Sequence, residues 1–188
     1  GKGEKTYLMM KYILCLFILF ISGCVNKTDT IPDQTLDQIS TTTTDQFSYG
    51  KQLMDEHKYI EAIEIFSYQI TQTPMIASLY TYRAIAFSEI KRHDEAIKDI
   101  SHAFQLSPND NSILFLRGQL NYGAKNYKAA LADFDSVQVR DTNFTSVWIN
   151  KGYVYLKLGN KLEACKCFSI AVERGDDEAE VVKNQECE

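Results

Sequence analysis

A repeat of 34 residues governs the chain after residue 45 and constrains its fold more than any other feature. Small side chains recur at this interval in two series, Gly50, Ala84, Gly118 and Gly152, and Ala62, Ala96, Ala130 and Ala164. A third series holds large apolar side chains in the same register: Phe66, Ile100, Phe134 and Phe168. Three series in one register indicate four copies of one unit, which bury their apolar faces by stacking on one another.

Each unit carries two helical patterns joined by a short polar turn. In the second unit we expect an A helix over Tyr80–Ile90 and a B helix over Asp94–Ser107, because apolar residues recur there at the spacing of one helix face. Gly or Ala at the crossing point lets the two axes approach closely. Pro74 and Pro108 close the first two units, since proline cannot continue a helix.

This pattern resembles the tetratricopeptide repeat, whose signature has Trp, Leu, Gly and Tyr in its first helix, Ala and Phe in its second, and a closing Pro. The fourth unit matches that signature at Trp148, Gly152, Tyr155, Ala164 and Phe168. The resemblance covers residues 43–178. It implies an all-α fold, a right-handed superhelical solenoid of four helix hairpins over residues 46–178 and a C-terminal capping helix over residues 179–188.

Units two and three depart from the signature in the same way. Each carries Arg where the signature has Leu and, sixteen residues later, an Asp: Arg83 with Asp99 and Arg117 with Asp133. We hypothesise that each Arg crosses from its A helix to pair with the Asp of its own B helix; the alternative is two unrelated surface charges. A buried pair of this kind orients a hairpin more than it stabilises it. Units one and four have neither residue at these positions.

The C-terminal stretch "GDDEAEVVKNQECE" has the composition of a helix start after Gly175, with Asp176 or Asp177 as the cap. We expect this helix to cover the last B helix, which would otherwise expose apolar surface. Cys165 and Cys167 lie ~200° apart around a helix. We therefore expect a disulfide between Cys165 and Cys187 that ties the cap to the last repeat, with Cys167 as a packing thiol.

The N-terminal segment has the layout of a secretory signal. Ten apolar residues, Tyr12–Ile21, follow Lys11, and this run is too short to span a bilayer. The following Ile21-Ser22-Gly23-Cys24 resembles a bacterial lipobox, which implies cleavage before Cys24 and its lipidation. We interpret residues 1–23 as the signal peptide, with an upstream extension over residues 1–8, and residues 24–45 as a lipidated cysteine and flexible tether. The alternative is a short signal anchor with an incidental cysteine.

Charge and motifs disfavour several classes of function. The net charge of −5 gives no basic field for nucleic acid. His57, His93 and His102 have no metal-ligand spacing, and no phosphate loop or nucleophile motif is present. We expect no enzyme activity, cofactor, metal site or small-molecule substrate.

In tetratricopeptide repeats the A helices line a curved groove, and the resemblance places ten residues of this chain there. They are Phe47, Lys51, Thr81, Tyr82, Ile85, Phe115, Gln119, Tyr122, Ile149 and Tyr153. An aromatic and aliphatic groove with little charge suits a segment of another protein; the alternative is that part of the aromatic side chains pack within the repeats.

From these features we expect a lipid-anchored adaptor or assembly factor of the cell envelope, at the outer membrane facing the periplasm, that binds a protein or peptide. The first alternative is an accessory subunit of a secretion, pilus or wall-modifying system. The second is an enzyme with an unrecognised site. A partner on the convex face is a third.

Overall fold

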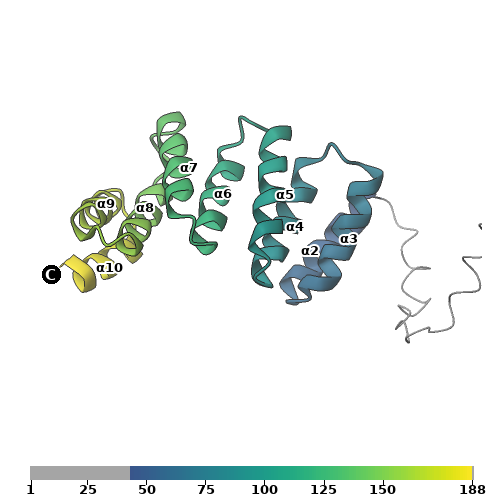
Figure 1. The fold of residues 1–188 in the computed structure, drawn as a ribbon, viewed down its shortest axis with the longest axis horizontal. Coiled ribbons are helices and arrows are strands. Elements are labelled where there is room, and N and C mark those ends of the chain that lie inside the picture. The colour runs from purple at the N-terminus through teal and green to yellow at the C-terminus, as the bar shows by residue number, and fades with distance from the viewer. Residues whose placement is uncertain (1–42, 188) are drawn as a thin grey trace, which may run out of the picture. The chain divides into compact units, whose positions relative to one another are not determined.

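The computed structural model describes residues 43–187, and within this range the chain forms nine α-helices and no strand (Figure 1). The helices are α2 (Thr43–Asp55), α3 (Tyr59–Gln72), α4 (Ala77–Glu89), α5 (His93–Leu106), α6 (Asn111–Gly123), α7 (Tyr127–Arg140), α8 (Ser146–Lys157), α9 (Lys161–Glu173) and α10 (Asp177–Cys187). None of these helices has the length and apolar content needed to cross a bilayer. The expected signal peptide, Cys24 and all of the expected tether except its last three residues lie outside the described residues.

Eight of these helices form the four hairpins that the repeat predicts, and the hairpins follow one another in a row (Figure 1). Each B helix contacts its own A helix and the A helix of the next hairpin, and α10 packs on α9. The first helix begins at Thr43, three residues before the expected boundary, and α4 begins three residues before Tyr80. The repeat series mark where helices cross, and they leave the first turn of an A helix unmarked.

A close contact between the glycine of the A helix and the phenylalanine of the B helix sets the crossing in three hairpins. A Cβ on Gly50, Gly118 or Gly152 would lie 2.3–2.6 Å from the nearest ring atom of Phe66, Phe134 or Phe168, respectively. Real Cβ atoms do not approach that closely, so only glycine fits opposite phenylalanine. In the second hairpin the pair is Ala84 and Ile100, both fully buried. The smaller isoleucine there leaves room for the methyl group of alanine.

Three residues in the turns between A and B helices have a left-handed backbone without being glycine. They are His57, Lys91 and Lys125, with φ of 59°, 64° and 64°, and the fourth turn has Gly159 with φ of 75° at the equivalent position. Only glycine adopts this conformation without steric cost. Because the hairpins stack in one register, the four turns line one edge of the domain, which we call the turn edge: residues 56–58, 90–92, 124–126 and 158–160.

Ion pairs join the helices at the Arg positions. Arg83 Nε and Nη2 donate to the two carboxylate oxygens of Asp99 at 2.6 and 2.8 Å, and Nη1 donates to Ser67 of the preceding hairpin at 3.0 Å. Arg117 Nε lies 3.1 and 3.2 Å from the oxygens of Asp133. These are the two hypothesised pairs, and both Asp side chains are buried.

The fourth hairpin has an ion pair that sequence analysis missed. Lys151, which occupies the Arg position, lies 2.6 Å from Asp135 and donates to Gln138 at 2.9 Å. Both partners belong to α7, the B helix of the preceding hairpin. The equivalent place in α9 holds Cys167, a buried thiol whose pKa burial raises, so the lysine pairs across the hairpin boundary instead.

The C-terminal helix is held in two ways. Asp176 accepts a hydrogen bond from the backbone N–H of Ala179 at 3.0 Å and so caps the start of α10. Near the other end, Cys187 forms a disulfide with Cys165 of α9. Between them, Ala179 is fully buried against the last hairpin. The helix thus covers α9 as a partial further repeat.

Candidate peptide-binding face

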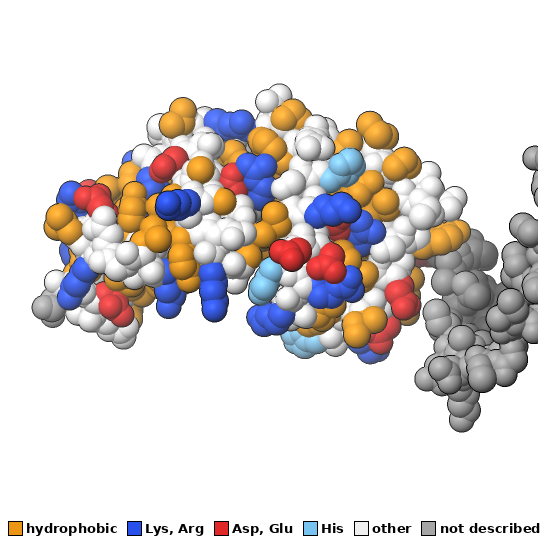
Figure 2. Space-filling model, viewed as in Figure 1, with side chains coloured by type: hydrophobic (Ala, Val, Ile, Leu, Met, Phe, Trp, Pro, Cys, Tyr) orange, Lys and Arg blue, Asp and Glu red, His pale blue; other side chains and the backbone are white. Residues whose placement is uncertain are grey.

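The A helices α2, α4, α6 and α8 contact one another in order along the row of hairpins. We call the surface that they form the A-helix face; it carries the ten residues that the sequence assigns to a groove. Figure 2 shows the domain in the same view as Figure 1 with its side chains coloured by type.

Each of the five aromatic residues of this set makes at least one ring contact within the hairpins. Phe47 and Tyr82 contact each other, with ring centroids 5.2 Å apart, and both contact Phe66. The remaining contacts join Phe115 to Phe134 and Phe144, Tyr122 to Tyr127, and Tyr153 to Phe168. All five are half-buried. Their rings therefore serve the packing of the repeats and still present an exposed part on the A-helix face.

The other five residues divide into exposed, half-buried and buried. Lys51 and Gln119 are exposed; Lys51 Nζ lies 5.5 Å from the centre of the Tyr82 ring, and Gln119 donates to Asn150 of α8 at 3.5 Å. Thr81 and Ile85 are half-buried. Ile149 is only 6% exposed.

The expectation that Ile149 lines the groove is therefore wrong. It belongs to one core cluster with Phe168 and with Ala179 of α10. The C-terminal helix closes the end of the domain at this point. The side chain of Ile149 is consequently not available to a ligand.

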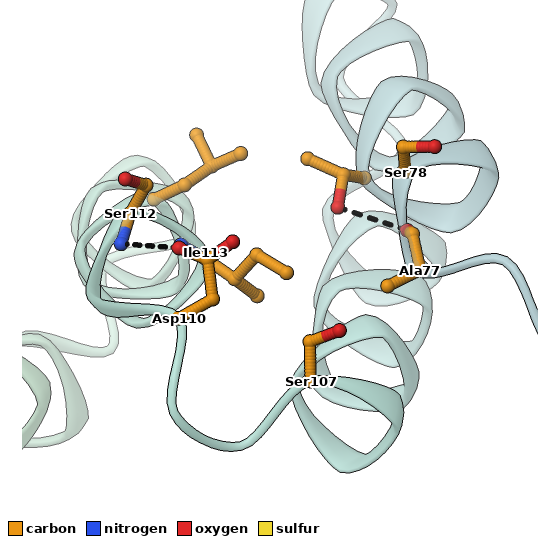
Figure 3. Close-up of a pocket in the computed structure, with 8 residues that line it drawn as sticks. Ala77, Ser78, Ser107, Asp110, Ser112 and Ile113 are labelled. Carbon is orange, nitrogen blue, oxygen red and sulfur yellow. Dashed lines mark hydrogen bonds between the residues drawn. The ribbon is translucent and has the colours of Figure 1, made fainter.

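A hollow of about 390 Å³ lies between the N-terminal ends of α4 and α6 (Figure 3). Thr81 is the only one of the ten expected residues in its lining, which consists of Ala77, Ser78, Thr81, Ser107, Asp110, Ser112, Ile113 and Leu116. Ser78 and Ser112 stand on the two facing helices, and Asp110 accepts hydrogen bonds from the backbone N–H groups of Ser112 and Ile113. The lining thus offers hydroxyl groups beside apolar side chains.

A sequence signal for this hollow existed. Ser78, Ser112 and Ser146 recur at the 34-residue interval, three positions before the residues equivalent to Thr81. These serines lie one turn earlier on the same helix face, because residues three apart are neighbours on a helix. The groove assignment began one turn too late to include them.

At the other end of the A-helix face, α10 contributes a carboxylate. The hydroxyl of Tyr153 donates to Glu178 at 2.8 Å. Burial, with Glu178 next in effect, raises the pKa of Tyr153 to about 12. This end of the face is consequently acidic, whereas Lys51 stands at the α2 end.

No cluster of His, Cys, Asp and Glu that could hold a metal ion occurs within residues 43–187. The ring of His57 is 2.7 Å from the Tyr59 hydroxyl, and His102 makes an edge-to-face contact with Tyr80. Both histidines contact tyrosines of the hairpins. Within the described residues, neither belongs to a cluster with carboxylates that could hold a metal ion.

Solved structures share this fold. YrrB, described as a TPR protein with an unusual peptide-binding site, superposes with a TM-score of 0.69 at 20% identity over 81% of this chain and 79% of that chain. MamA superposes with a TM-score of 0.68 at 20% identity, over 78% of this chain and 86% of that chain. At this identity the likeness is one of fold.

Sequence comparisons place the same repeat in the chain. Residues 145–174 match the family model described as tetratricopeptide repeat. Tetratricopeptide repeat protein 13 of Homo sapiens is 28% identical over 138 residues, which make up 73% of this chain and 16% of that protein. The chain thus spans a small part of this much longer relative. Residues 145–174 thus carry a tetratricopeptide repeat, and the four hairpins share the fold of solved tetratricopeptide-repeat proteins.

Proposed function

We propose that the A-helix face binds an extended segment of another protein and that the chain acts as a lipid-anchored adaptor or assembly factor of the cell envelope. The hollow between α4 and α6 carries the binding part of the proposal. It combines the hydroxyls of Ser78 and Ser112 with the apolar side chains of Ile113 and Leu116. Such a lining suits a peptide, whose backbone needs hydrogen-bond partners and whose side chains need apolar contacts.

Two further observations support a protein partner. Half-buried aromatic residues adjoin the hollow in sequence, Tyr82 beside Thr81 and Phe115 beside Leu116, and aromatic side chains supply much of the binding energy at protein interfaces. YrrB, which has the same fold, is described as having a peptide-binding site. Both favour a binding protein over an enzyme.

The test is a crosslinking pull-down from native membranes with a variant that fills the hollow, Ser78→Arg with Ser112→Arg. Both serines are exposed, so the substitutions add bulk and charge without opening the core. A partner captured by the wild-type chain should bind this variant with at least about tenfold lower affinity, which corresponds to about 1.4 kcal/mol.

The matched control places the same two side chains on B helices, Gln105→Arg with Ser136→Arg, where both residues are exposed. This control should keep the partner. If the hollow-filling variant folds and retains every partner, the A-helix face is not the binding surface, and the convex face takes its place.

The anchor is a separate part of the proposal and rests on Ile21-Ser22-Gly23-Cys24 behind the apolar run. Metabolic labelling with a clickable palmitate analogue should mark the wild-type chain and not Cys24→Ala. Equal labelling of both chains, or of neither, would contradict the lipidation of Cys24 and leave the binding test unaffected.

A further inference from the structure

The turn edge of the last two hairpins carries a cluster of lysines, and the acidic residue that follows it, Glu163, is paired with Lys166. Lys125 lies in the turn between α6 and α7 and Lys128 at the start of α7, and Lys157 and Lys161 flank the turn between α8 and α9. No acidic residue occurs over residues 123–128 or 156–162. For a chain with a net charge of −5, this is a local reversal of sign.

All four lysines are exposed, and within residues 43–187 none of them forms an ion pair. Three other exposed basic residues of the domain are paired. Lys58, Arg92 and Lys166 each pair with a glutamate on the same helix or turn. The four unpaired lysines consequently keep their charge available to an outside partner.

Two exposed leucines stand among these lysines. Leu158 is 44% exposed and Leu162 is 68% exposed, on either side of Gly159, whose left-handed backbone makes the turn. The sequence there alternates Lys and Leu around the turn, "KLGNKL" over residues 157–162. Exposed leucines gain most when a partner with an apolar interior covers them.

Adjacent turns along this edge lie close enough to act together. A Cβ on Gly123, at the end of α6, would lie 4.0 Å from the ring of His93 at the start of α5. The equivalent positions one hairpin later are Tyr127 and Lys157, so the register of the repeat brings the two lysine-bearing turns side by side. Figure 2 shows Lys and Arg side chains at the lower edge of the row of hairpins.

We propose that this part of the turn edge docks on the surface of an anionic lipid bilayer. The four lysines bind headgroup phosphates, and Leu158 and Leu162 sink between the headgroups. Clusters of four or more basic residues recognise anionic lipid in this way, and apolar side chains beside them add burial. A protein partner with an acidic surface would use the lysines and leave the leucines exposed, so the leucines favour the bilayer. The proposal is independent of lipidation at Cys24 and of the A-helix face.

The test uses tryptophan fluorescence of the full chain with vesicles of brominated lipid, because bromine quenches only a tryptophan that enters the bilayer. Leu162→Trp places the probe on the proposed contact. Val139→Trp is the matched control, because Val139 is 84% exposed at the end of α7 remote from the turn edge. The signal of wild-type Trp148 is subtracted from both. Comparing the two probes removes vesicle association through any other part of the chain.

With vesicles that contain phosphatidylglycerol we expect severalfold stronger quenching of Leu162→Trp than of Val139→Trp, and little quenching of either with phosphatidylcholine alone. Added salt should weaken the effect, since it screens exposed charges. A fourfold Lys→Gln variant of the cluster should lose it. A charge-matched control should keep it, with Lys→Gln at Lys51, Lys58, Lys98 and Lys183.

Equal quenching of the two probes on anionic vesicles would overturn the proposal. A shift of the Leu162→Trp emission on addition of polyglutamate, without any quenching by vesicles, would also overturn it and assign the edge to an acidic polypeptide. Circular dichroism of each variant shows whether the helices persist, so that loss of folding is not read as loss of docking.

Discussion

The ring of Phe134 lies so close to Gly118 that a methyl group on the glycine would come within 2.6 Å of it. The same relationship recurs in the first and fourth hairpins, whereas the second pairs Ala84 with Ile100. The chain therefore contains two residue pairs that fit this crossing, Gly with Phe and Ala with Ile. One pair can be substituted for the other as a test.

Gly118→Ala should destabilise the domain by about 1–3 kcal/mol, because the added methyl group overpacks the hairpin crossing. Combining it with Phe134→Ile should recover part of that loss, since it recreates the pair of the second hairpin. Urea unfolding followed by circular dichroism measures both changes. If the effects of the two substitutions on the free energy of unfolding are additive, the contact between these residues does not determine how closely the two helices can approach.

Arg83→Ala should cost about 3–5 kcal/mol, because it leaves the buried carboxylate of Asp99 without its partner. The double variant Arg83→Tyr with Asp99→Ile copies the apolar residues that the first hairpin has at these positions, Tyr49 and Ile65. It should cost much less than Arg83→Ala. Denaturant unfolding of the two variants decides the question, and an equal loss in both would show that the ion pair itself stabilises the fold.

The disulfide between Cys165 and Cys187 closes a loop with a sequence separation of 22 residues. Replacing both cysteines by serine should lower stability by about 3 kcal/mol at most, by the loop-entropy account. The loss should appear first in α10, which the buried Ala179 and the hydrogen bond from Tyr153 to Glu178 then hold to the last hairpin. Hydrogen exchange should rise over residues 177–187 while α4–α7 stay protected. Uniform loss of protection would mean that the cap stabilises the whole solenoid.

Stability should fall at high pH through Tyr153. Burial and Glu178 raise its pKa to about 12 from the ordinary value of 10, so the folded chain retains a proton that the unfolded chain has released. The stabilisation is complete below pH ~10 and is lost as pH rises toward ~12.

Denaturation midpoints measured across that range should fall more steeply for wild type than for Tyr153→Phe. This comparison cancels the titration of the other tyrosines. Parallel curves would show that the Tyr153 hydroxyl is not held in its neutral form.

Contacts inside a hairpin were predictable from sequence, because they depend on fixed offsets along two helices of one unit. The offset of sixteen residues that separates each Gly from its Phe also places the side chain of Arg83 opposite Asp99. Disulfide pairing followed from a similar local argument, since Cys187 lies on the helix that covers the helix of Cys165.

Contacts between hairpins were not predictable in the same way. Lys151 pairs with Asp135 of the preceding hairpin, and the hollow is lined by residues of both α4 and α6. Such contacts depend on how far one hairpin is displaced against the next, and a residue series such as Ser78, Ser112 and Ser146 marks positions without giving that displacement.

By itself, the sequence determined the number, type and order of the helices, because a 34-residue register of small and large side chains allows only one pattern of hairpin crossings. Only the tertiary structure decided which equivalent positions stay accessible. Phe115 remains half-exposed, whereas Ile149, one repeat later, is buried in a core that includes α10. Both residues occupy the same place in their repeats; what differs is the neighbouring helix that packs beside them.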